Sequence, residues 1–423
     1  MSVVIPLASR IHGPHYYKQL LKNFKDFFVT RNVKVLDVID SEELITDDVL
    51  NALRGSTPIF FLLTGGTSRL SWKLLNLGNL RRALIFAHGG HNSLPSAISI
   101  KNRADVEGIP TKIYFCKDVS TSECYNVFDE AVTLSNNVTQ ISNTRVAVVS
   151  DVVDDLHSIF ENITGIRTSL VGYDELMKLF EEVRNKEVDY YLSKLSVKLD
   201  LTGVNDLPLK NAIRMYLALK ELVERNGFNA VSLDCFPLLT KYGITPCLAV
   251  SLLNDDGVPT ACEADLRSLL LMLIAKAVGS WPAWIANIAS VDGNRMVLAH
   301  CTIATGLARQ CRITTHFESN YPYSLSCNLP SGTYTLVGID REFTTMAALK
   351  VRVLDSGSLF GDMCRTQVVV ESEVDLNYFP NIALSNHHVL LPGDPSMKIK
   401  DVGYMLGLDF ISYESLIKYL AEG

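Results

Sequence analysis

The alternation of short apolar runs with amphipathic segments in the first third of the chain is the feature that most constrains its fold. Residues 16–30 carry large apolar side chains at helical spacings of three or four: Tyr17, Leu20, Leu21, Phe24 and Phe28. Strings typical of strands lie before and after this helix: VVIPLA, VKVLDVI, PIFFLLTGG, RALIFAH and TKIYFC. Strands that alternate with helices form a parallel, doubly wound sheet with helices on both faces. We therefore predict an α/β domain over residues 1–142.

A second alternating region predicts a second α/β domain over residues 143–280. The polar stretch 135–144 precedes a new strand, RVAVVSD, which places the first boundary there. We expect further strands at TSLVGY, AVSLDCF and PCLAVSLLND, and helices at 175–195, at 209–226 and from about Cys262 onward. This region thus repeats the doubly wound parallel architecture.

The chain changes character at Trp281, where strand-like strings take over. They read PAWIANI, MVLAHCTIA, CRITTHF, TYTLVGID, ALKVRVLDS, TQVVVES and HHVLLP, separated by Gly, Asn and Asp turns. Such a series predicts a mainly antiparallel, barrel-like domain over residues 281–423, closed by helices at DVGYMLGL and YESLIKYLAE. The expected fold class is therefore α/β, with two parallel-sheet domains followed by a β-rich domain.

Composition excludes several classes of function. Of the 423 residues, 48% are apolar and 20% are charged, and the net charge of −7 comes without a Lys/Arg run that would bind nucleic acid. The most apolar helical segment, 266–278, is too short to span a membrane and contains Arg267 and Lys276. The N-terminus reaches Arg10 before any long apolar stretch, so we expect no signal peptide and no membrane partner.

The nine cysteines are scattered along the chain and form no C-x-x-C pair. An odd count without a spacing framework favours reduced thiols, most of them small core residues. We therefore expect a cytoplasmic protein with reduced cysteines.

The densest cluster of chemically active side chains lies at 254–265, which reads NDDGVPTACEAD. Glu263 and Asp265 stand near the start of the helix predicted there. Such carboxylates are often only structural, since a helix dipole favours them by about 0.3–1 kcal/mol. Glu263 has apolar neighbours, however, and a buried carboxylate is costly unless it is paired or metal-bound. The turn also follows a predicted strand, where α/β sheets bind ligands, so both interpretations stay open.

Histidines supply a second set of candidates. Residues 386–394 read NHHVLLPGD, and His300 lies near the end of an apolar strand. Adjacent residues of a strand point to opposite faces, so at most one of His387 and His388 is expected in a given site. For each of the three histidines, burial in a hydrogen-bonded core is the alternative.

Two Gly-containing loops follow strands of the first predicted sheet. Residues 64–67 read TGGT and residues 88–93 read HGGHNS. The first loop lacks both G-x-G-x-x-G and the Walker pattern, which favours a tight turn over a nucleotide site. The second loop offers polar donors and acceptors from His91, Asn92 and Ser93, which suit a small polar ligand.

The string PCLAVSLLNDDGVPTACEADLRSLLLMLIAKAVGSWPAWIAN, followed by MVLAHCT and later by NHHVLLPGD, resembles the L-fucose/L-arabinose isomerase-like family. HNSLPSA near residue 91 is similar to the first domain of archaeal-type L-fucose isomerase-related members. The resemblance spans most of the chain and is strongest over 231–302 and 363–407. It implies a homo-oligomer, a trimer or hexamer, with the active site between the second and third domains and walled by a neighbouring subunit's first domain.

The resemblance also implies which residues form the site. Glu263 matches the first metal-binding glutamate, and one of His387 and His388 matches the late histidine ligand; we favour His388. His300 matches a histidine that lines the metal site in arabinose-type members. The loop with His91, Asn92 and Ser93 is expected to contact the sugar. Trp284 fits a core aromatic, with stacking on the sugar as the alternative.

One position departs from the family pattern. Where members carry an aspartate or glutamate that binds metal and moves a proton, this chain has Asn287. Its amide oxygen can bind a hard cation, but it takes up no proton at neutral pH. Asp234, Asp265 and Asp292 are candidate substitutes, and Asp234, at the end of a predicted strand, is preferred. Asp265 is expected to face away from Glu263 and to serve as a helix cap or a salt-bridge partner.

The implied reaction is aldose–ketose isomerisation of a small open-chain sugar through an enediolate, with a divalent metal at the site. Oxygen and imidazole ligands suit Mn²⁺, with Mg²⁺ or Co²⁺ as alternatives. Because of Asn287, two other functions stay open on the same fold. One is binding of a sugar or sugar phosphate without turnover, and the other is epimerisation or aldol cleavage.

Overall fold

The computed structural model describes residues 2–152, 154–195 and 199–422, and it divides into two compact units. Unit 1 comprises Met1–Asn143 and Asp401–Gly407, and unit 2 comprises Thr144–Lys400 and Leu408–Gly423.

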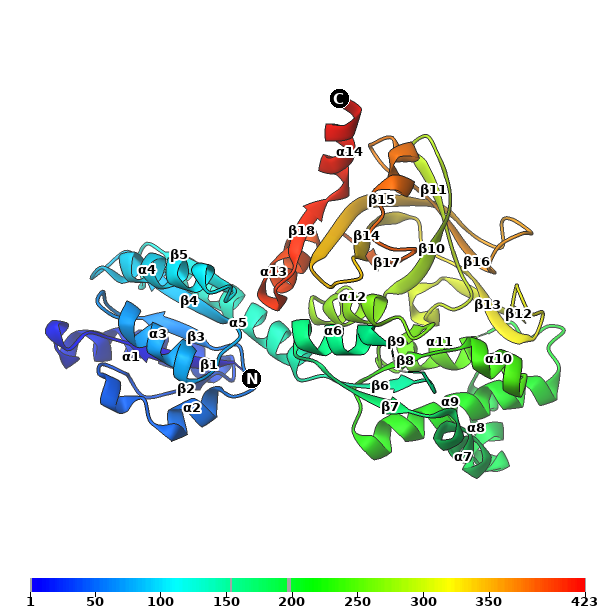
Figure 1. Ribbon diagram of the computed structural model, residues 1–423, viewed down its shortest axis with the longest axis horizontal. Coiled ribbons are helices and arrows are strands. Elements are labelled where there is room, and N and C mark those ends of the chain that lie inside the picture. The colour runs from blue at the N-terminus through cyan, green and yellow to red at the C-terminus, as the bar shows by residue number, and fades with distance from the viewer. Residues whose placement is uncertain (1, 153, 196–198, 423) are drawn as a thin grey trace. The chain divides into compact units, whose positions relative to one another are not determined.

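Unit 1 is built on a five-stranded sheet in the order β2-β1-β3-β4-β5, and all its pairings are parallel (Figure 1). The strands are β1 (Val3–Leu7), β2 (Lys34–Val35), β3 (Ile59–Leu62), β4 (Ala83–His88) and β5 (Thr111–Cys116). The helices are α1 (Pro14–Thr30), α2 (Asp47–Leu53), α3 (Ser68–Leu77), α4 (Ser93–Val106) and α5 (Ser122–Ser142).

Both faces of this sheet are covered by helices, because its strands are apolar on both sides. Phe60 packs in the core cluster that includes side chains of α3 and α4. Phe61, the next residue, contacts Phe24 of α1 and Phe128 of α5 on the opposite face. The doubly wound parallel architecture predicted from the sequence is confirmed.

Asp401–Gly407, most of it the second half of α13 (Ser396–Leu406), contributes to unit 1 although it comes late in the chain. The Tyr404 hydroxyl donates to the carbonyl oxygen of Thr111 at 3.1 Å, and Lys112 pairs with Asp401. Unit 1 is therefore discontinuous in sequence.

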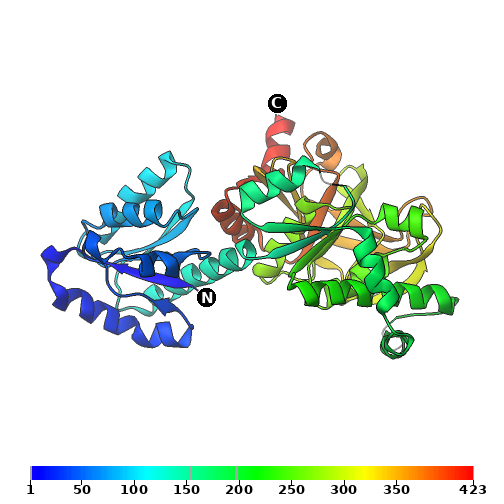
Figure 2. The ribbon, with the colours of Figure 1, turned by 60° about the horizontal axis from the view of Figure 1, so that its bottom comes forward.

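Unit 2 begins with a four-stranded parallel sheet in the order β7-β6-β8-β9 (Figure 2). Its strands are β6 (Arg145–Val149), β7 (Arg167–Val171), β8 (Ala230–Leu233) and β9 (Thr260–Cys262). Its helices are α6 (Asp155–Thr164), α7 (Tyr173–Glu182), α8 (Asn185–Leu195), α9 (Asp206–Asn226), α10 (Phe236–Tyr242), α11 (Cys247–Asp255) and α12 (Leu266–Ala277). Most buried side chains of α7, α9 and α11 pack against one face of this sheet.

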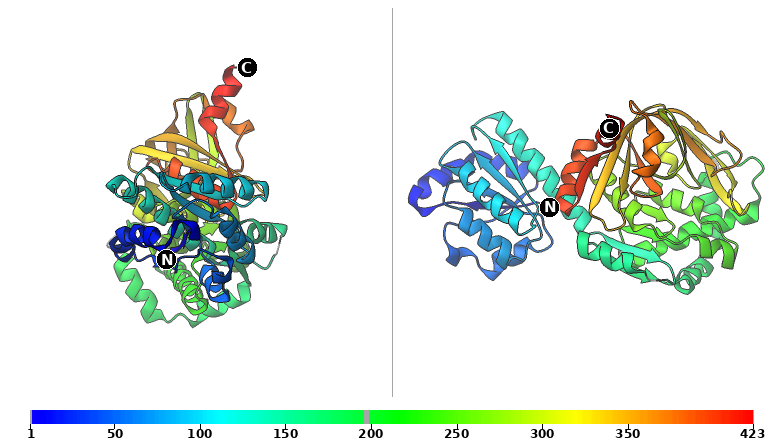
Figure 3. Two further views of the ribbon diagram at one scale, coloured as in Figure 1. Left: turned by 90° about the vertical axis from the view of Figure 1, so that its left-hand side faces the viewer. Right: turned by 45° about the horizontal axis from the view of Figure 1, so that its top comes forward.

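Six antiparallel strands of unit 2 close into a barrel in the order β14-β17-β10-β11-β16-β15, because β14 pairs with both β17 and β15 (Figure 3). They are β10 (Trp284–Asp292), β11 (Arg295–His300), β14 (Gly332–Ile339), β15 (Thr345–Gly357), β16 (Thr366–Glu371) and β17 (His387–Pro392). A hairpin of β12 (Gln310–Thr315) and β13 (Pro322–Asn328), the strand β18 (Asp409–Ser412) and α14 (Tyr413–Glu422) complete the region. The predicted antiparallel, barrel-like architecture is confirmed.

Two predictions for the segment before the barrel are wrong. The string PCLAVSLLND forms helix α11 (Cys247–Asp255) and not a strand. Because α11 is buried on nearly every side, its apolar residues show neither the helical period of 3.6 nor the strand period of 2, so the pattern does not distinguish a helix from a strand. The helix expected from about Cys262 starts at Leu266. Glu263 and Ala264 instead form a turn in the left-handed region, with φ of 60° and 51°.

The prediction of reduced cysteines is only partly right. Disulfides join Cys116 to Cys124 and Cys311 to Cys327, a pair that lies directly opposite across β12 and β13. Five cysteines are free, and the sulfur atoms of Cys301 and Cys364 are 3.2 Å apart. Topology brings these partners together, which a search for C-x-x-C spacing does not detect.

None of the described helices combines the length and the apolar character that crossing a membrane requires. The cytoplasmic location stays a prediction.

Candidate metal centre

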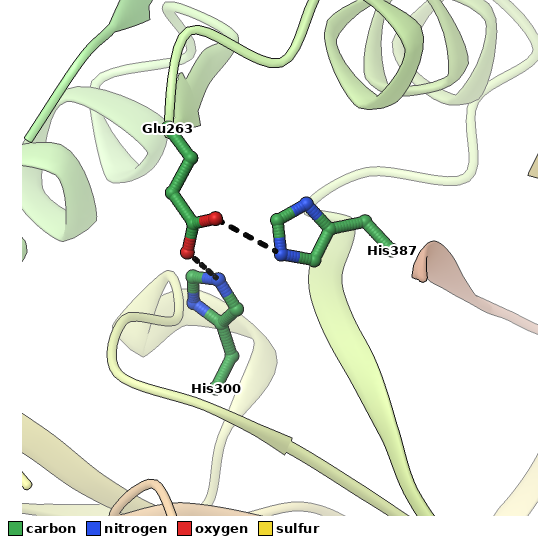
Figure 4. Close-up of side chains that lie close together, drawn as sticks. All are labelled: Glu263, His300 and His387. Atoms are coloured by element: carbon green, nitrogen blue, oxygen red, sulfur yellow. Dashed lines mark ion pairs between the residues drawn. The ribbon is translucent and has the colours of Figure 1, made fainter. Parts of the chain in front are cut away.

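Three segments that are far apart in sequence bring Glu263, His300 and His387 together in unit 2 (Figure 4). Glu263 lies in the left-handed turn that follows β9, at the carboxyl end of the parallel sheet. His300 is the last residue of β11, and His387 is the first residue of β17. The carboxylate thus comes from the α/β part of the unit and the two imidazoles come from the barrel.

The geometry of these three side chains fits one metal ion. Glu263 Oε1 lies 3.8 Å from His300 Nε2, and Glu263 Oε2 lies 3.7 Å from His387 Nε2. One ligand atom from each residue lies within 4.8 Å of the other two, and no other such group occurs in the described part of the chain. The two separations are too long for hydrogen bonds and slightly longer than the ~3–3.5 Å between neighbouring ligands of an ion with bonds of about 2.1 Å.

One unpaired nitrogen atom, on His387, supports the same conclusion. His387 Nε2 is buried and has no hydrogen-bond partner, although it is directed at Glu263. Buried polar atoms nearly always have a partner, and an exception needs an explanation such as an ion. The donor set of one carboxylate and two imidazoles suits a divalent transition metal.

Asp265 holds His387 from the other side of the ring. Its Oδ2 lies 3.0 Å from His387 Nδ1. Its Oδ1 accepts hydrogen bonds from the backbone N–H groups of Arg267 and Ser268, so it caps helix α12. The prediction of a capping role is right, but Asp265 also contacts the site, which sequence reasoning missed because Glu263 lies in the turn and not on the helix.

Burial and charge set the protonation of the group. Burial raises the pKa of Glu263; the charges of Asp265, Glu318 and Asp234 raise it further, whereas His387 lowers it. Burial lowers the pKa of His300 to about 3, so its imidazole is neutral at physiological pH and can act as a ligand.

In the Asp265–His387 pair, the mutual attraction of the two side chains outweighs the effect of burial on both pKa values. Burial by itself would raise the pKa of Asp265, but the hydrogen bond and charge of His387 outweigh it and lower the value to about 2. Burial would likewise lower the pKa of His387, but Asp265 and then Glu263 outweigh it, and the pKa is raised. Asp265 is therefore ionised.

The structure places His387, and not the favoured His388, beside Glu263. In the register of β17 with β10, His388 stands opposite Ala286, on the side that faces the barrel core. There its Nε2 lies 3.0 Å from the Tyr413 hydroxyl, and burial lowers its pKa to about 3. The prediction that only one of the two histidines joins the site agrees with this geometry.

Asn287 stands directly opposite His387 in the same register, so the two side chains emerge on the same face of the sheet. Its Oδ1 accepts a hydrogen bond of 3.5 Å from Asn386. Asp234 follows β8 at the carboxyl end of the parallel sheet, and Ser150 donates to its carboxylate at 3.4 Å. Neither residue has a hydrogen bond or ion pair with Glu263 among the contacts of the described residues.

The other predicted site residues lie elsewhere. His91, Asn92 and Ser93 belong to unit 1, before or at the start of α4; His91 packs on Tyr16, with ring centroids 3.6 Å apart. Trp284 is buried in the barrel core and donates from Nε1 to the carbonyl oxygen of Thr302 at 2.8 Å. The structure thus favours the core role of Trp284 over stacking on a sugar.

Comparison with known proteins finds similarity to sugar isomerases. Residues 131–280 match the L-arabinose isomerase central domain. A sulfoquinovose isomerase of Clostridium sp. (strain MSTE9) is 28% identical over 233 residues, which is 51% of this chain and 51% of that protein. The sulfoquinovose isomerase of Priestia aryabhattai is 21% identical over 216 residues, 48% of each chain. The chain thus spans about half the length of the curated relatives it matches, and these similarities support a relationship to the arabinose/fucose isomerase-like proteins.

Proposed function

We propose that this chain is a metal-dependent aldose–ketose isomerase that acts on an open-chain sugar through an enediolate. The observation that carries the proposal is the convergence of Glu263, His300 and His387, with an unpaired nitrogen of His387 directed at the carboxylate. The similarity to an L-arabinose isomerase domain and to sulfoquinovose isomerases supports the same reaction class.

Glu263, His300 and His387 are the proposed metal ligands, and the amide oxygen of Asn287 is the proposed fourth. Mn²⁺ suits this mixed set best, with Mg²⁺ and Co²⁺ as alternatives. When bound, the ion would supply Lewis-acid stabilisation of the charge that develops on the sugar oxygens at C1 and C2.

The protein's own part is to move one proton between C2 and C1. We assign this transfer to Glu263, whose side chain is 34% exposed and so can meet a substrate. A base takes the C2 proton and returns it to C1, and the hydroxyl proton of O2 moves to O1, which converts the aldose to the ketose with no change in composition. Such catalysis typically contributes about 10²–10⁴-fold. Asp234 is the proposed second proton carrier, because Asn287 cannot serve.

We further propose that the active form is a trimer or hexamer. In it, the loop with His91, Asn92 and Ser93 of a neighbouring subunit would line the site and bind sugar hydroxyl groups. Light scattering would give the oligomer number. Mixing inactive His91→Ala and Glu263→Gln proteins should restore part of the activity if the two residues act across subunits, and none if they act within one chain.

The direct test is ketose formation by the purified protein with Mn²⁺. Sulfoquinovose is the first substrate to try, since the relatives are named for it, followed by L-arabinose and L-fucose. Glu263→Gln should abolish turnover with folding intact, whereas Glu224→Gln, on the exposed side of α9, should leave it unchanged. Activity that survives both Glu263→Gln and a chelator would overturn the proposal.

Asn287 favours a second candidate function on the same site. A protein without the second carboxylate can bind a sugar or sugar phosphate without turnover, or use an enediolate for epimerisation or aldol cleavage. Calorimetry would measure metal and sugar binding, and exchange of the C2 proton in D₂O would report deprotonation. Binding without exchange identifies a binding protein; exchange without ketose identifies the other reactions.

A further inference from the structure

We propose that Asp265 is a positioning residue that fixes which ring nitrogen of His387 carries the proton. In this arrangement Nδ1 is protonated and the Nε2 lone pair is directed at Glu263. The proposal rests on the proposed metal site only for its functional consequence, because the position of the proton is a property of the metal-free protein.

The hydrogen bonds of Asp265 leave one position for that proton. Oδ2 accepts from the Ser268 hydroxyl at 2.7 Å and faces His387 Nδ1 at 3.0 Å. The carboxyl group of Asp265 already accepts three hydrogen bonds, from the N–H groups of Arg267 and Ser268 and from the Ser268 hydroxyl. It therefore acts as an acceptor toward His387 as well, and the hydrogen between Oδ2 and Nδ1 belongs to Nδ1. With Nδ1 protonated, a neutral imidazole carries its lone pair on Nε2, the atom that a metal requires.

The position of Asp265 is itself fixed by the helix. Its Oδ1 accepts from the N–H groups of Arg267 and Ser268 at 2.9 and 3.2 Å, and the side chain is 5% exposed. The start of α12 and the start of β17 are thus joined through one carboxylate. Partners of this kind orient metal-binding histidines, and their loss typically weakens metal binding about 10–100-fold.

His387 is the only one of three histidines in this region with such a partner. His388 Nε2 meets the Tyr413 hydroxyl, which can donate or accept, and its Nδ1 has no partner. His300 Nδ1 is buried and also has no hydrogen bond. Among these three histidines, only His387 therefore has a carboxylate that fixes its ring orientation and the position of its proton.

Asp265→Asn tests the assignment with little change in shape. Asparagine is as good an N-cap as aspartate, so its oxygen can keep the cap of α12. Its NH₂ group then faces His387 Nδ1 as a donor and forces the proton to Nε2. We expect ¹⁵N spectra of histidine-labelled, metal-free protein to show Nδ1–H in the wild type and Nε2–H in Asp265→Asn. We expect the Kd for Mn²⁺ to rise about 10–100-fold.

Three further variants serve as controls. His387→Gln assigns the ¹⁵N signals by their loss. Asp154→Asn, at the N-cap of α6, removes the charge of a cap without a histidine partner and should change neither readout. Ser268→Ala removes the other side-chain donor to Oδ2 and should leave Nδ1 protonated. A shift of the proton in Asp154→Asn would show that loss of a cap charge elsewhere is sufficient. A shift in Ser268→Ala would show that the Ser268 hydroxyl sets the proton. Either result would contradict the proposal.

The outcomes separate this proposal from the proposed function. A wild-type spectrum of the neutral imidazole with Nε2–H and without Nδ1–H overturns the assignment without any variant. An unchanged Kd in a folded Asp265→Asn protein also overturns it and leaves the metal site standing. If the wild type binds no Mn²⁺, the proposed function fails, while the spectra still decide the position of the proton.

Discussion

At the scale of single residues, two neighbouring histidines differ because a strand alternates its faces. His387 meets Glu263, whereas His388 faces the core beside Gly338, where an added Cβ would lie only 2.5 Å from His388 Nε2. The sequence NHHV predicts that the two residues separate, but it does not predict which one faces the site. That choice depends on the register between β17 and β10, which no local pattern reveals.

Substitution of each histidine by glutamine should separate the two roles. We expect His387→Gln to lose Mn²⁺ binding in electron paramagnetic resonance titrations. His388→Gln should keep it but lower the free energy of unfolding by about 1–3 kcal/mol, because a buried hydrogen bond to Tyr413 is disturbed. The opposite pattern, with Mn²⁺ binding lost only in His388→Gln, would contradict the assignment of the ligand.

The contact between Cys301 and Cys364 also leads to a prediction. Their sulfur atoms are 3.2 Å apart, and Cys364 is partly exposed whereas Cys301 is buried. With an excess of a small-molecule disulfide, two-step exchange should join them and release two thiols. Peptide mapping after alkylation should find this crosslink before any that involves the buried Cys235, Cys247 or Cys262. A stable mixed disulfide on Cys364, with no crosslink, would contradict the prediction.

At the scale of elements, the sequence predicted most strands but not the surroundings of Glu263. The string HHVLLP forms β17 as predicted, because its six residues, set between turn residues, have the length of a strand and are too few for a typical helix. Helix α11 was mistaken for a strand because its side chains are buried on nearly every side. The left-handed turn at Glu263 and Ala264 has no sequence signal, since neither residue favours positive φ.

The end of α11 gives a prediction at this scale. The carboxylate of Asp255 accepts hydrogen bonds from the Thr305 N–H, the Thr305 hydroxyl and the Gly306 N–H, which ties α11 to the loop after β11. Asp255→Ala should lower the free energy of unfolding in urea by about 1–3 kcal/mol, because these donors lose a charged acceptor. Glu181→Ala, exposed on α7, is the control and should change it by less than about 0.5 kcal/mol. Equal effects of the two substitutions would contradict the role of Asp255.

At the scale of the whole molecule, the sequence predicts the architecture but not how the residues of the candidate metal site come together. The parallel sheets follow from their strand–helix rhythm, and the barrel follows from its series of short strands. The meeting of Glu263 with His300 and His387 depends on how the barrel packs against the α/β part of unit 2. The resemblance named Glu263 and His300 but favoured His388 over His387, and only the fold shows that His387 and Asp265 belong to the group.

Metal binding should stabilise one unit and leave the other unchanged. Units 1 and 2 have separate cores, so calorimetry should resolve two unfolding transitions. Mn²⁺ at 100 times its Kd should stabilise unit 2 by about 2.7 kcal/mol, and EDTA should reverse this. Glu263→Gln should remove the shift. Equal shifts of both transitions, or a shift that persists in Glu263→Gln, would contradict a metal centre confined to unit 2.

The discontinuity of unit 1 has a consequence for the order in which the protein matures. A ribosome completes the five strands of this unit early, yet Asp401 and Tyr404, which bind Lys112 and Thr111, emerge only after the whole barrel has been synthesised. The nascent first unit therefore lacks its last segment while residues 144–400 are synthesised. A chain terminated between residues 143 and 400 should contain all five parallel strands of unit 1 but lack Asp401 and Tyr404. It should therefore expose to proteases the surface around Lys112 and Thr111 that these residues cover.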